Sequence, residues 1–227
     1  MELQKTTLLE KREIANEVLE IRLIKPKNFN FLAGQFIQIH IQKEDKKIFR
    51  SYSISSKPTD EYIALCIKLY ENGVGSELFR NVHPNEEITF KGPMGRFTHN
   101  IQNEDLYFIA TGVGLAPIMG IIRDELENKK NHNKIHLLFG VRNEKNIFWI
   151  DKLDELQKNY PNFTYTLTIS QPEDSWTGLR GRVTEHIKEN TSNLHAYLCG
   201  SAEMVKDVRK MLTIRGTEVN KIHFEIF

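Results

Sequence analysis

The stretch LYFIATGVGLAPIMG, residues 106–120, joins an apolar run to a glycine turn and then to a segment with helical spacing. Gly112 and Gly114 directly follow the apolar run, where glycines let backbone N–H groups approach a phosphate closely. Pro117 suits the first turn of a helix, because the N–H that it lacks has no partner there. The spacing is not the Gly-x-Gly-x-x-Gly of ordinary dehydrogenases, and a tight turn without a ligand is the alternative. The strand–turn–helix context favours a phosphate-binding turn.

The sequence after residue 105 repeats a strand, a loop and a helix, which is the succession that a parallel sheet covered by helices requires. Besides the strand already quoted, the expected strands are IHLLFG (135–140), FTYTLTIS (163–170), HAYLCG (195–200) and KIHFEIF (221–227). The expected helices are APIMGIIRDELENKK (116–130), FWIDKLDELQKNY (148–160), RVTEHIKEN (182–190) and SAEMVKDVRKMLTIRG (201–216). We therefore predict an α/β parallel-sheet, Rossmann-like domain with ligands at the carboxyl ends of its strands.

The first half of the chain has a different period, with short alternating runs between turns. The runs that read as strands are VLEIRLI (18–24), QFIQIHI (35–41), RSYSIS (50–55), YIALCIKLY (62–70) and EEITFKG (86–92), and GSELFRNV (75–82) reads as a short helix. Strands that close on themselves leave no free edge, so an antiparallel β-barrel is predicted rather than an open sheet. The polar stretch 98–105 is the expected boundary between a domain of residues 1–99 and a domain of residues 100–227.

The composition is that of an ordinary soluble globular protein, with 40% hydrophobic and 27% charged residues. A net charge of +1 gives no argument for binding to nucleic acid or to a membrane. The amino-terminal stretch contains no apolar signal core and no apolar run approaches a membrane span, so a cytoplasmic protein is expected. Cys66 and Cys199 have no metal-ligand spacing, which excludes a four-cysteine iron–sulfur cluster within this sequence and predicts no metal site.

Four further strings carry residue types that suit ligands. RSYSISS (50–56) offers a cation, a flat ring and hydroxyls, and by itself it fits a ligand site or a solvated edge strand. YENGVGS (70–76) enters the short helix with N–H groups available for an anion, and GPMGRF (92–97) closes the last barrel strand with a turn. CGSAEMV (199–205) puts a small thiol and a glycine at a strand end, which leaves room for a flat ring. Each of the last three strings also fits a purely structural role.

Six strings occur in the order Arg-x-Tyr-Ser, Gly-x-Gly-Ser, Gly-Pro-x-Gly-x-Phe, Thr-Gly-x-Gly-x-Ala-Pro, Cys-Gly-x-x-x-Met-Val and a terminal Glu-x-aromatic. In this order they resemble the ferredoxin–NADP reductase superfamily over essentially the whole chain. The resemblance implies an FAD-binding barrel followed by an NAD(P)-binding domain.

By this resemblance, Arg50 holds the flavin pyrophosphate, Tyr52 stacks on the isoalloxazine and Ser53 bonds near the reactive flavin nitrogen. A guanidinium fork matches phosphate geometry, and a tyrosine ring offers a stacking face, so the chemistry of these side chains agrees. The resemblance places further FAD contacts at Ser51, Ile67, Lys68, Leu69, Val74, Gly75 and Ser76. It places nucleotide contacts at Thr111, Gly112, Val113, Gly114, Pro117, Ser170, Gly200 and Met204. It gathers Ser53, Cys199 and Glu225 as catalytic residues around the nicotinamide, with Phe227 on the flavin face.

The choice of nicotinamide cofactor stays open between NADPH and NADH. Arg142 and Arg182 stand where superfamily members that favour NADPH often place cations for the 2′-phosphate. However, Ser170-Gln171-Pro172 lacks the arginine that many of those members carry after the matching serine. Ser170 together with Trp176-Thr177-Gly178 is more similar to the branches that use NADH.

The resemblance implies an FAD-dependent oxidoreductase that takes hydride from NAD(P)H and passes electrons to a separate carrier. Ferredoxin, flavodoxin or another small electron carrier is the expected partner, because the iron–sulfur domain fused to some superfamily members is missing from this sequence. Two rival hypotheses stay open. One is an NAD(P)H:flavin reductase that releases its flavin, and the other is a non-catalytic flavoprotein subunit that relays electrons.

Overall fold

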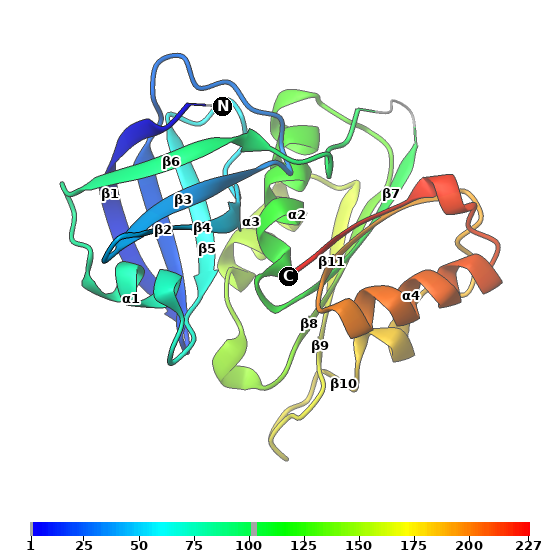
Figure 1. The fold of residues 1–227 in the computed structure, drawn as a ribbon. Coiled ribbons are helices and arrows are strands. Elements are labelled where there is room, and N and C mark those ends of the chain that lie inside the picture. The colour runs from blue at the N-terminus through cyan, green and yellow to red at the C-terminus, as the bar shows by residue number, and fades with distance from the viewer. Residues whose placement is uncertain (1, 101–103) are drawn as a thin grey trace.

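A computed structural model of the chain describes residues 2–100 and 104–227, which form two sheets side by side (Figure 1). The first sheet is antiparallel. Its strands are β1 (Gln4–Ala15), β2 (Val18–Ile24), β3 (Phe36–Lys43), β4 (Lys46–Ser53), β5 (Tyr62–Lys68) and β6 (Glu87–Met94), in the order β4-β3-β6-β1-β2-β5. A bridge between Ile54 and Leu65 brings the two ends of this order together, so the sheet closes into the predicted barrel. Helix α1 (Val74–Asn81) follows β5.

Alternation of side chains accounts for most of the barrel. In β3, Ile37, Ile39 and Ile41 are buried in the barrel core, while the residues between them are partly exposed. The sequence does not predict β1, because QKTTLLEKREIA is mostly polar and only Thr6 and Leu8 in it are deeply buried. Pairing with β2 and β6 therefore defines this strand more than its own side chains do.

The second sheet is parallel, with the strand order β10-β9-β8-β7-β11-β12. Its strands are β7 (Asp105–Thr111), β8 (Ile135–Val141), β9 (Phe163–Ile169), β10 (Leu179–Arg180), β11 (Leu194–Gly200) and β12 (Ile222–Ile226). The helices between them are α2 (Leu115–Arg123), α3 (Ile150–Asn159) and α4 (Ala202–Ile214), and α2 continues as one π-helical turn over Asp124–Asn128. The predicted parallel α/β sheet is confirmed. The expected boundary at 98–105 includes residues 101–103, which lie outside the described residues.

The prediction of a helix over residues 182–190 is wrong, because only a 3₁₀ turn forms there, at Val183–His186. The Glu185 side chain accepts a hydrogen bond from the Arg182 backbone N–H at 2.7 Å, which closes the turn at its start. Val183 and Ile187 are both buried against the sheet, and these two anchors fix a short turn. None of the helices in the described part of the chain has the length and apolar character that crossing a membrane demands.

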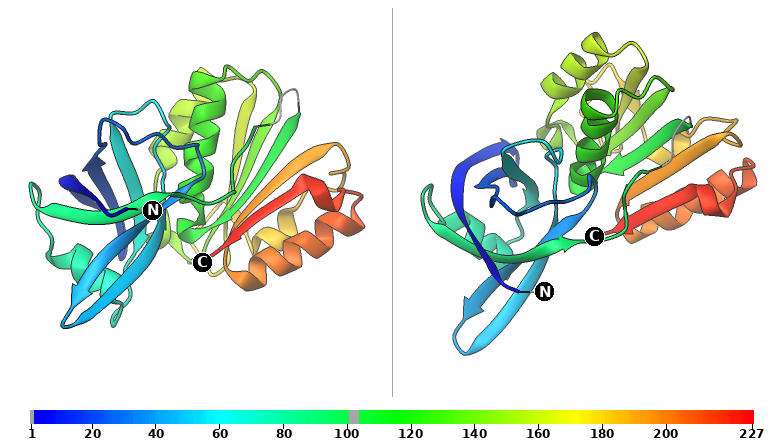
Figure 2. Two further views of the ribbon diagram at one scale, coloured as in Figure 1. Left: turned by 45° about the horizontal axis from the view of Figure 1, so that its top comes forward. Right: turned by 90° about the horizontal axis from the view of Figure 1, so that it is seen from above.

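Helices cover both faces of the parallel sheet, and the C-terminal strand ends between the sheet and the barrel (Figures 1 and 2). Helices α2 and α3 share one core with Phe108 and Phe139, whereas α4 packs on the opposite face with Tyr107 and Leu138. The chain builds the sheet outward from β7 in one direction and then returns to place β11 on its other side. Ligands of such sheets bind where the strand order reverses, which here lies between the carboxyl ends of β7 and β11.

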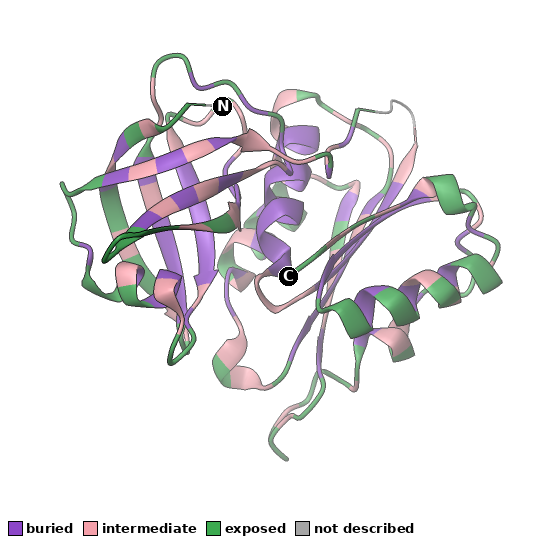
Figure 3. Ribbon diagram, viewed as in Figure 1, coloured by how far each residue is buried: buried purple, intermediate pink, exposed green. Residues whose placement is uncertain are grey.

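Helix α2 lies between the two sheets and is buried along nearly its whole length (Figure 3). Gly120 in this helix lies so close to the barrel that an added Cβ would stand 3.1 Å from the carbonyl oxygens of both Ile54 and Ser56. Val18 and Cys66 of the barrel belong to the same apolar core as α2. The barrel and the parallel sheet are therefore fixed to each other by close packing.

A buried carboxylate forms a second link between the sheets. Glu20 of β2 is 5% exposed and accepts hydrogen bonds from Lys152 Nζ, at 2.9 Å, and from Trp149 Nε1, at 3.1 Å. Burial by itself raises the pKa of Glu20, but the hydrogen bond and charge of Lys152, with Trp149 and Arg22, lower it below 4.5. The ionised carboxylate therefore stabilises the docked arrangement.

We predict that Glu20→Gln lowers the free energy of unfolding by about 1–3 kcal/mol at neutral pH, because it removes charge-assisted hydrogen bonds across the interface. The folded-state pKa is lowered, so this stabilisation is present above pH 4.5 and is lost as the pH falls below that value. Urea unfolding at several pH values measures the difference between the two proteins, which should shrink in acid. The control is Glu87→Gln, which breaks an exposed pair with Lys5 and should change stability little. An equal loss in both variants would contradict the interface role of Glu20.

Candidate functional site

The two glycine turns at the ends of β7 and β11 interlock. An added Cβ on Gly114 would overlap the Cys199 carbonyl, and one on Gly200 would overlap the Thr111 side chain, so neither position has room for a side chain. Gly112 adopts a φ of 53° in a 3₁₀ turn, and an added Cβ there would meet open space. Pro117 is buried in the first turn of α2, as its sequence position predicts. The turns therefore present backbone at the strand ends, where a phosphate or a flat ring can approach it.

A cleft of about 1240 Å³ opens in front of these turns. Many residues that the sequence assigns to cofactors line it: Lys68, Leu69, Thr111, Gly112, Val113, Arg142, Ser170, Arg182, Gly200, Met204 and Phe227. Sites for small molecules usually enclose about 300–1,000 Å³, so this cleft has room for a dinucleotide. It runs from the barrel, at β5, to the loops that follow β8 and β9 in the parallel sheet.

Three predicted catalytic residues meet where the barrel reaches the last strand of the parallel sheet. Cys199 and Glu225 are direct register partners on β11 and β12. Ser53, the last residue of β4, donates a hydrogen bond from Oγ to Glu225 Oε2 at 3.5 Å. The carboxylate therefore bridges the two sheets beside a buried thiol.

Burial governs the protonation of this group. Burial raises the pKa of the Cys199 thiol well above 9.0, and the neighbouring Glu225 raises it further. Burial also raises the pKa of Glu225 above 4.5, and the hydrogen bond from Ser53 offsets part of that increase. Cys199 is therefore a neutral, compact side chain, and Glu225 holds a proton more readily than a solvated carboxyl does.

Arg50, Tyr52 and Gly75 come together on the barrel. The Tyr52 hydroxyl occupies the place that a Gly75 side chain would fill, and the Tyr52 ring packs edge-on to Phe79 with centroids 5.3 Å apart. Burial raises the pKa of Tyr52 to about 12, so the phenol stays neutral. Arg50 is exposed and uses only Nη1, toward the Phe49 carbonyl at 2.9 Å, within the described residues. The remaining guanidinium donors are free for an anion.

The other predicted FAD contacts lie around these residues, and several act through the backbone. Val74, Gly75 and Ser76 form the first turn of α1, whose N–H groups have no partner within the helix. The Ser76 hydroxyl is already used, because it accepts a hydrogen bond from the Tyr70 N–H at 2.8 Å. The side chains of Ile67 and Leu69 belong to the barrel core, and Ser51 accepts from Gln38 at 3.4 Å. Lys68 Nζ contacts Glu17 at 3.2 Å.

The cations expected near the ribose already have partners. Arg142 Nε donates to Gln171 at 2.9 Å, and Arg182 Nη1 pairs with Glu203 Oε1 at 2.8 Å. The hydrogen bond from Arg182 to Glu203 raises the Arg182 pKa, and Asp207 acts in the same direction. This end of the cleft therefore combines arginines with carboxylates instead of presenting free cations.

Sequence reasoning missed two residues that line the cleft. Glu203 lies in the CGSAEMV string, but only the fold brings it to Arg182, so the sequence gives no signal of the pair. The sequence pattern extends a strand to Tyr70, but the structure ends that strand at Lys68 and leaves the Tyr70 side chain 65% exposed in the cleft. An exposed aromatic beside a glycine turn is the signal that identifies it as a stacking candidate.

Two family models match this chain and together span most of it. Residues 5–99 match the family described as Oxidoreductase FAD-binding domain, and residues 108–210 match the Oxidoreductase NAD-binding domain. Their order agrees with the antiparallel barrel and the parallel sheet. The chain belongs to the ferredoxin–NADP reductase superfamily of FAD- and NAD-binding oxidoreductases.

Curated relatives are named as one of the subunits of a Na(+)-translocating NADH-quinone reductase. The protein of that name from Pseudomonas aeruginosa is 32% identical over 206 residues, which cover 83% of this chain and 51% of that protein. The one from Neisseria meningitidis is 29% identical over 207 residues, which cover 83% of this chain and 51% of that protein. The chain thus spans about half the length of these relatives.

Solved structures share the fold over nearly the whole chain. A cytochrome P450 reductase of Amycolatopsis has a TM-score of 0.89 at 24% identity, covering 99% of this chain and 70% of that one. A ferredoxin NADP+ reductase of Neisseria gonorrhoeae, with bound FAD and NADP, has a TM-score of 0.86 at 20% identity, covering 99% of this chain and 98% of that one.

We predict that Gly114→Ala lowers the free energy of unfolding by about 3 kcal/mol, because its Cβ overlaps backbone atoms of Cys199 that cannot rotate away. Gly112→Ala is the matched control. It has open space and only the strain of a positive φ, so it should cost about 1 kcal/mol. Urea unfolding of both variants measures these losses. A larger loss for Gly112→Ala would show that the two turns do not touch as described.

Proposed function

We propose that this protein transfers hydride from a nicotinamide dinucleotide to bound FAD and passes electrons on to a separate small carrier such as ferredoxin or flavodoxin. The observation that carries the proposal is the contact of Ser53 with Glu225, which joins the two domains beside Cys199 at the cleft. When bound, FAD supplies the ability to accept two electrons and release them one at a time. The chain supplies alignment and a controlled environment.

The barrel residues fit FAD. Arg50 keeps free guanidinium donors for a pyrophosphate, and the first turn of α1 adds unpartnered N–H groups nearby. Gly75 leaves room for the Tyr52 hydroxyl, which orients that ring against Phe79 and leaves its stacking role to the other face. We assign the pyrophosphate to Arg50 and α1, and the flavin ring to Tyr52.

The residues at the junction suit the transfer itself. Ser53 offers a hydroxyl, and Glu225 holds a proton at Oε2 or accepts one there. Cys199 is small, neutral and buried, so it leaves room for a nicotinamide ring without a competing charge. Phe227 lines the cleft and donates its backbone N–H to the Gly200 carbonyl at 3.2 Å, so it covers the space that a nicotinamide needs and must move aside. We assign these four residues to the nicotinamide end of the site.

The acidic partners of Arg182 favour NADH over NADPH. Glu203 pairs with Arg182, and Asp207 lines the same end of the cleft. Carboxylates accept hydrogen bonds from a ribose hydroxyl but repel a 2′-phosphate. We propose NADH as the donor, with Glu203 opposing the phosphate of NADPH.

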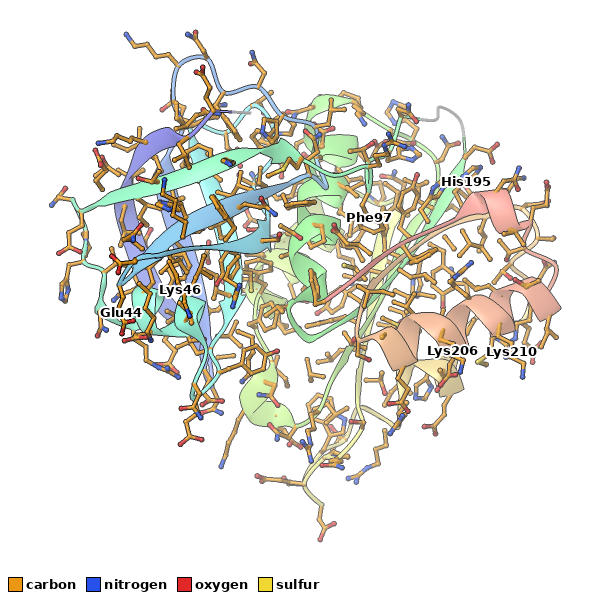
Figure 4. All side chains as sticks on the ribbon, viewed as in Figure 1. Glu44, Lys46, Phe97, His195, Lys206 and Lys210 are labelled. Carbon is orange, nitrogen blue, oxygen red and sulfur yellow. The ribbon has the colours of Figure 1, made fainter. Side chains whose placement is uncertain are left out.

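The surface of the barrel supports docking of an acidic carrier. Exposed cations on and beside β4 and β6 border the proposed flavin site: Lys46, Lys47, Arg50, Lys91 and Arg96. Lys46 lies on the barrel, remote from α4 (Figure 4). A patch of this kind steers acidic partners and makes the association rate depend on salt.

A second candidate is electron transfer within a larger NADH-oxidising assembly. The names of the curated relatives, which are subunits of an NADH-quinone reductase, favour it. The chain matches about half of those proteins, so the carrier that the other half would supply is a separate molecule in our proposal.

Anaerobic titration of the purified protein tests the proposed function. The protein should carry FAD, and its flavin absorbance should bleach faster with NADH than with NADPH. Protein isolated without flavin that consumes NADH only when flavin is added would be a flavin reductase. A yellow protein that neither nucleotide bleaches would be a relay subunit, and it would overturn the proposal. Faster bleaching by NADPH would contradict the role given to Glu203.

We predict that Glu225→Gln slows the bleaching of the flavin by NADH about tenfold or more, because small displacements of reacting groups are costly. Its FAD content should not change, since Glu225 lies away from Arg50 and α1. The matched control is Glu218→Gln, an exposed carboxylate that precedes the same strand and pairs with Lys221. Stopped-flow absorbance measures the rate. A Glu225→Gln rate equal to that of the control would remove Glu225 from the site.

A further inference from the structure

A second cavity, of about 630 Å³, lies between the barrel wall and helices α2 and α3. Its lining comes from β2 and β5 on one side and from the two helices on the other. It contains none of the residues assigned above to FAD or to the nicotinamide. Its volume falls within the range of about 300–1,000 Å³ that small organic ligands occupy.

Two polar atoms on the barrel side of this cavity lack partners. Ser55 is 4% exposed, and its Oγ makes no hydrogen bond within the described part of the chain. The Arg22 Nε atom is likewise buried and unpaired among the described residues. The two lie on adjoining strands, because Arg22 faces Ala64 in the sheet and the Ser55 N–H donates to the Ala64 carbonyl at 2.8 Å. Buried polar atoms without partners are rare in folded proteins, so this pair requires a reason.

Positive charge exceeds negative charge on the cavity lining. The cations are Arg22, Lys57, Arg123, Lys130 and Lys152, and the carboxylates are Glu20, Glu127 and Glu155. Glu20 is shared by Lys152 and Arg22, and Glu127 is shared by Arg123 and Lys57. Lys130 makes no ion pair with any residue that the structure describes. Even with Asp60, which pairs with Arg123 beside the cavity, the cations outnumber the carboxylates. The cavity therefore favours an anion.

The remaining lining is flat and apolar. Tyr62, Trp149 and Tyr160 contribute rings, and Met119 and Leu156 contribute apolar side chains. A single inorganic anion would leave this surface without contacts. A ligand with a flat apolar body and one anionic group would contact both parts of the lining.

We propose that this cavity is a second ligand site, which takes a small flat organic anion whose acidic group accepts hydrogen bonds from Ser55 Oγ and Arg22 Nε. The apolar body lies among the rings of the helix side. Such a ligand contacts the barrel and the parallel sheet at once, so it stabilises the docked arrangement of the two.

Calorimetric titration of 1-naphthyl phosphate into the FAD-loaded protein tests this site, with NAD+ saturating the larger cleft. We expect one saturable binding event. Inorganic phosphate and 1-naphthol, which each carry half of the required chemistry, should bind at least tenfold more weakly. Absence of saturable binding, or equal affinity for 1-naphthol, would overturn the proposal.

Variants locate the binding event. Ser55→Ala removes an unpartnered hydroxyl, so it should fold as the wild type does and weaken 1-naphthyl phosphate binding at least tenfold. Arg22→Gln should weaken it by a similar factor. The control is Lys206→Gln, on the exposed side of α4 (Figure 4), which should change nothing. FAD absorbance and bleaching by NADH should be normal in each variant, which separates failure of this site from failure of the proposed function. Unchanged binding in Ser55→Ala would place the ligand elsewhere.

Discussion

The close packing of α2 against the barrel is the constraint on which the rest of the structure depends. Gly120 brings this helix within contact distance of the carbonyl oxygens of Ile54 and Ser56, and no larger side chain fits there without displacement. Ser53 directly precedes this segment, so the same contact sets how far the end of β4 lies from Glu225. The candidate site is built from two separately ordered sheets, and its geometry is only as fixed as their shared core.

A second constraint operates at the ends of β7 and β11. Gly114 and Gly200 let two turns occupy space that side chains would otherwise fill, which keeps the strand ends bare. A bare strand end exposes backbone N–H groups, and it stands where the sheet order reverses. Chemistry can therefore gather there without weakening the core beneath it. The nearby buried residue, Cys199, is a small neutral thiol that fits this arrangement.

Three carboxylates of this protein show how surroundings decide the role of one functional group. Glu20 is buried among Lys152, Trp149 and Arg22, so its pKa is lowered and it acts as a fixed ionic link. Glu225 is buried with a hydroxyl as its hydrogen-bond partner, so its pKa is raised and it can hold a proton. Glu203 is exposed and pairs with Arg182, where it shapes the charge that a nucleotide meets. Burial and the charge of the nearest partner account for the differences.

The sequence by itself determined the two-part architecture, because alternation and the glycine turn at residues 112–114 are local signals. It did not determine β1, whose polar sequence becomes a strand through pairing, or the 3₁₀ turn at Val183–His186, which burial of two anchors shortened. The resemblance in motif order named Ser53, Cys199 and Glu225 together, but only the tertiary structure brought Ser53 to Glu225. The pair of Arg182 with Glu203 had no sequence signal at all, since contacts between distant segments follow from packing rather than from local pattern.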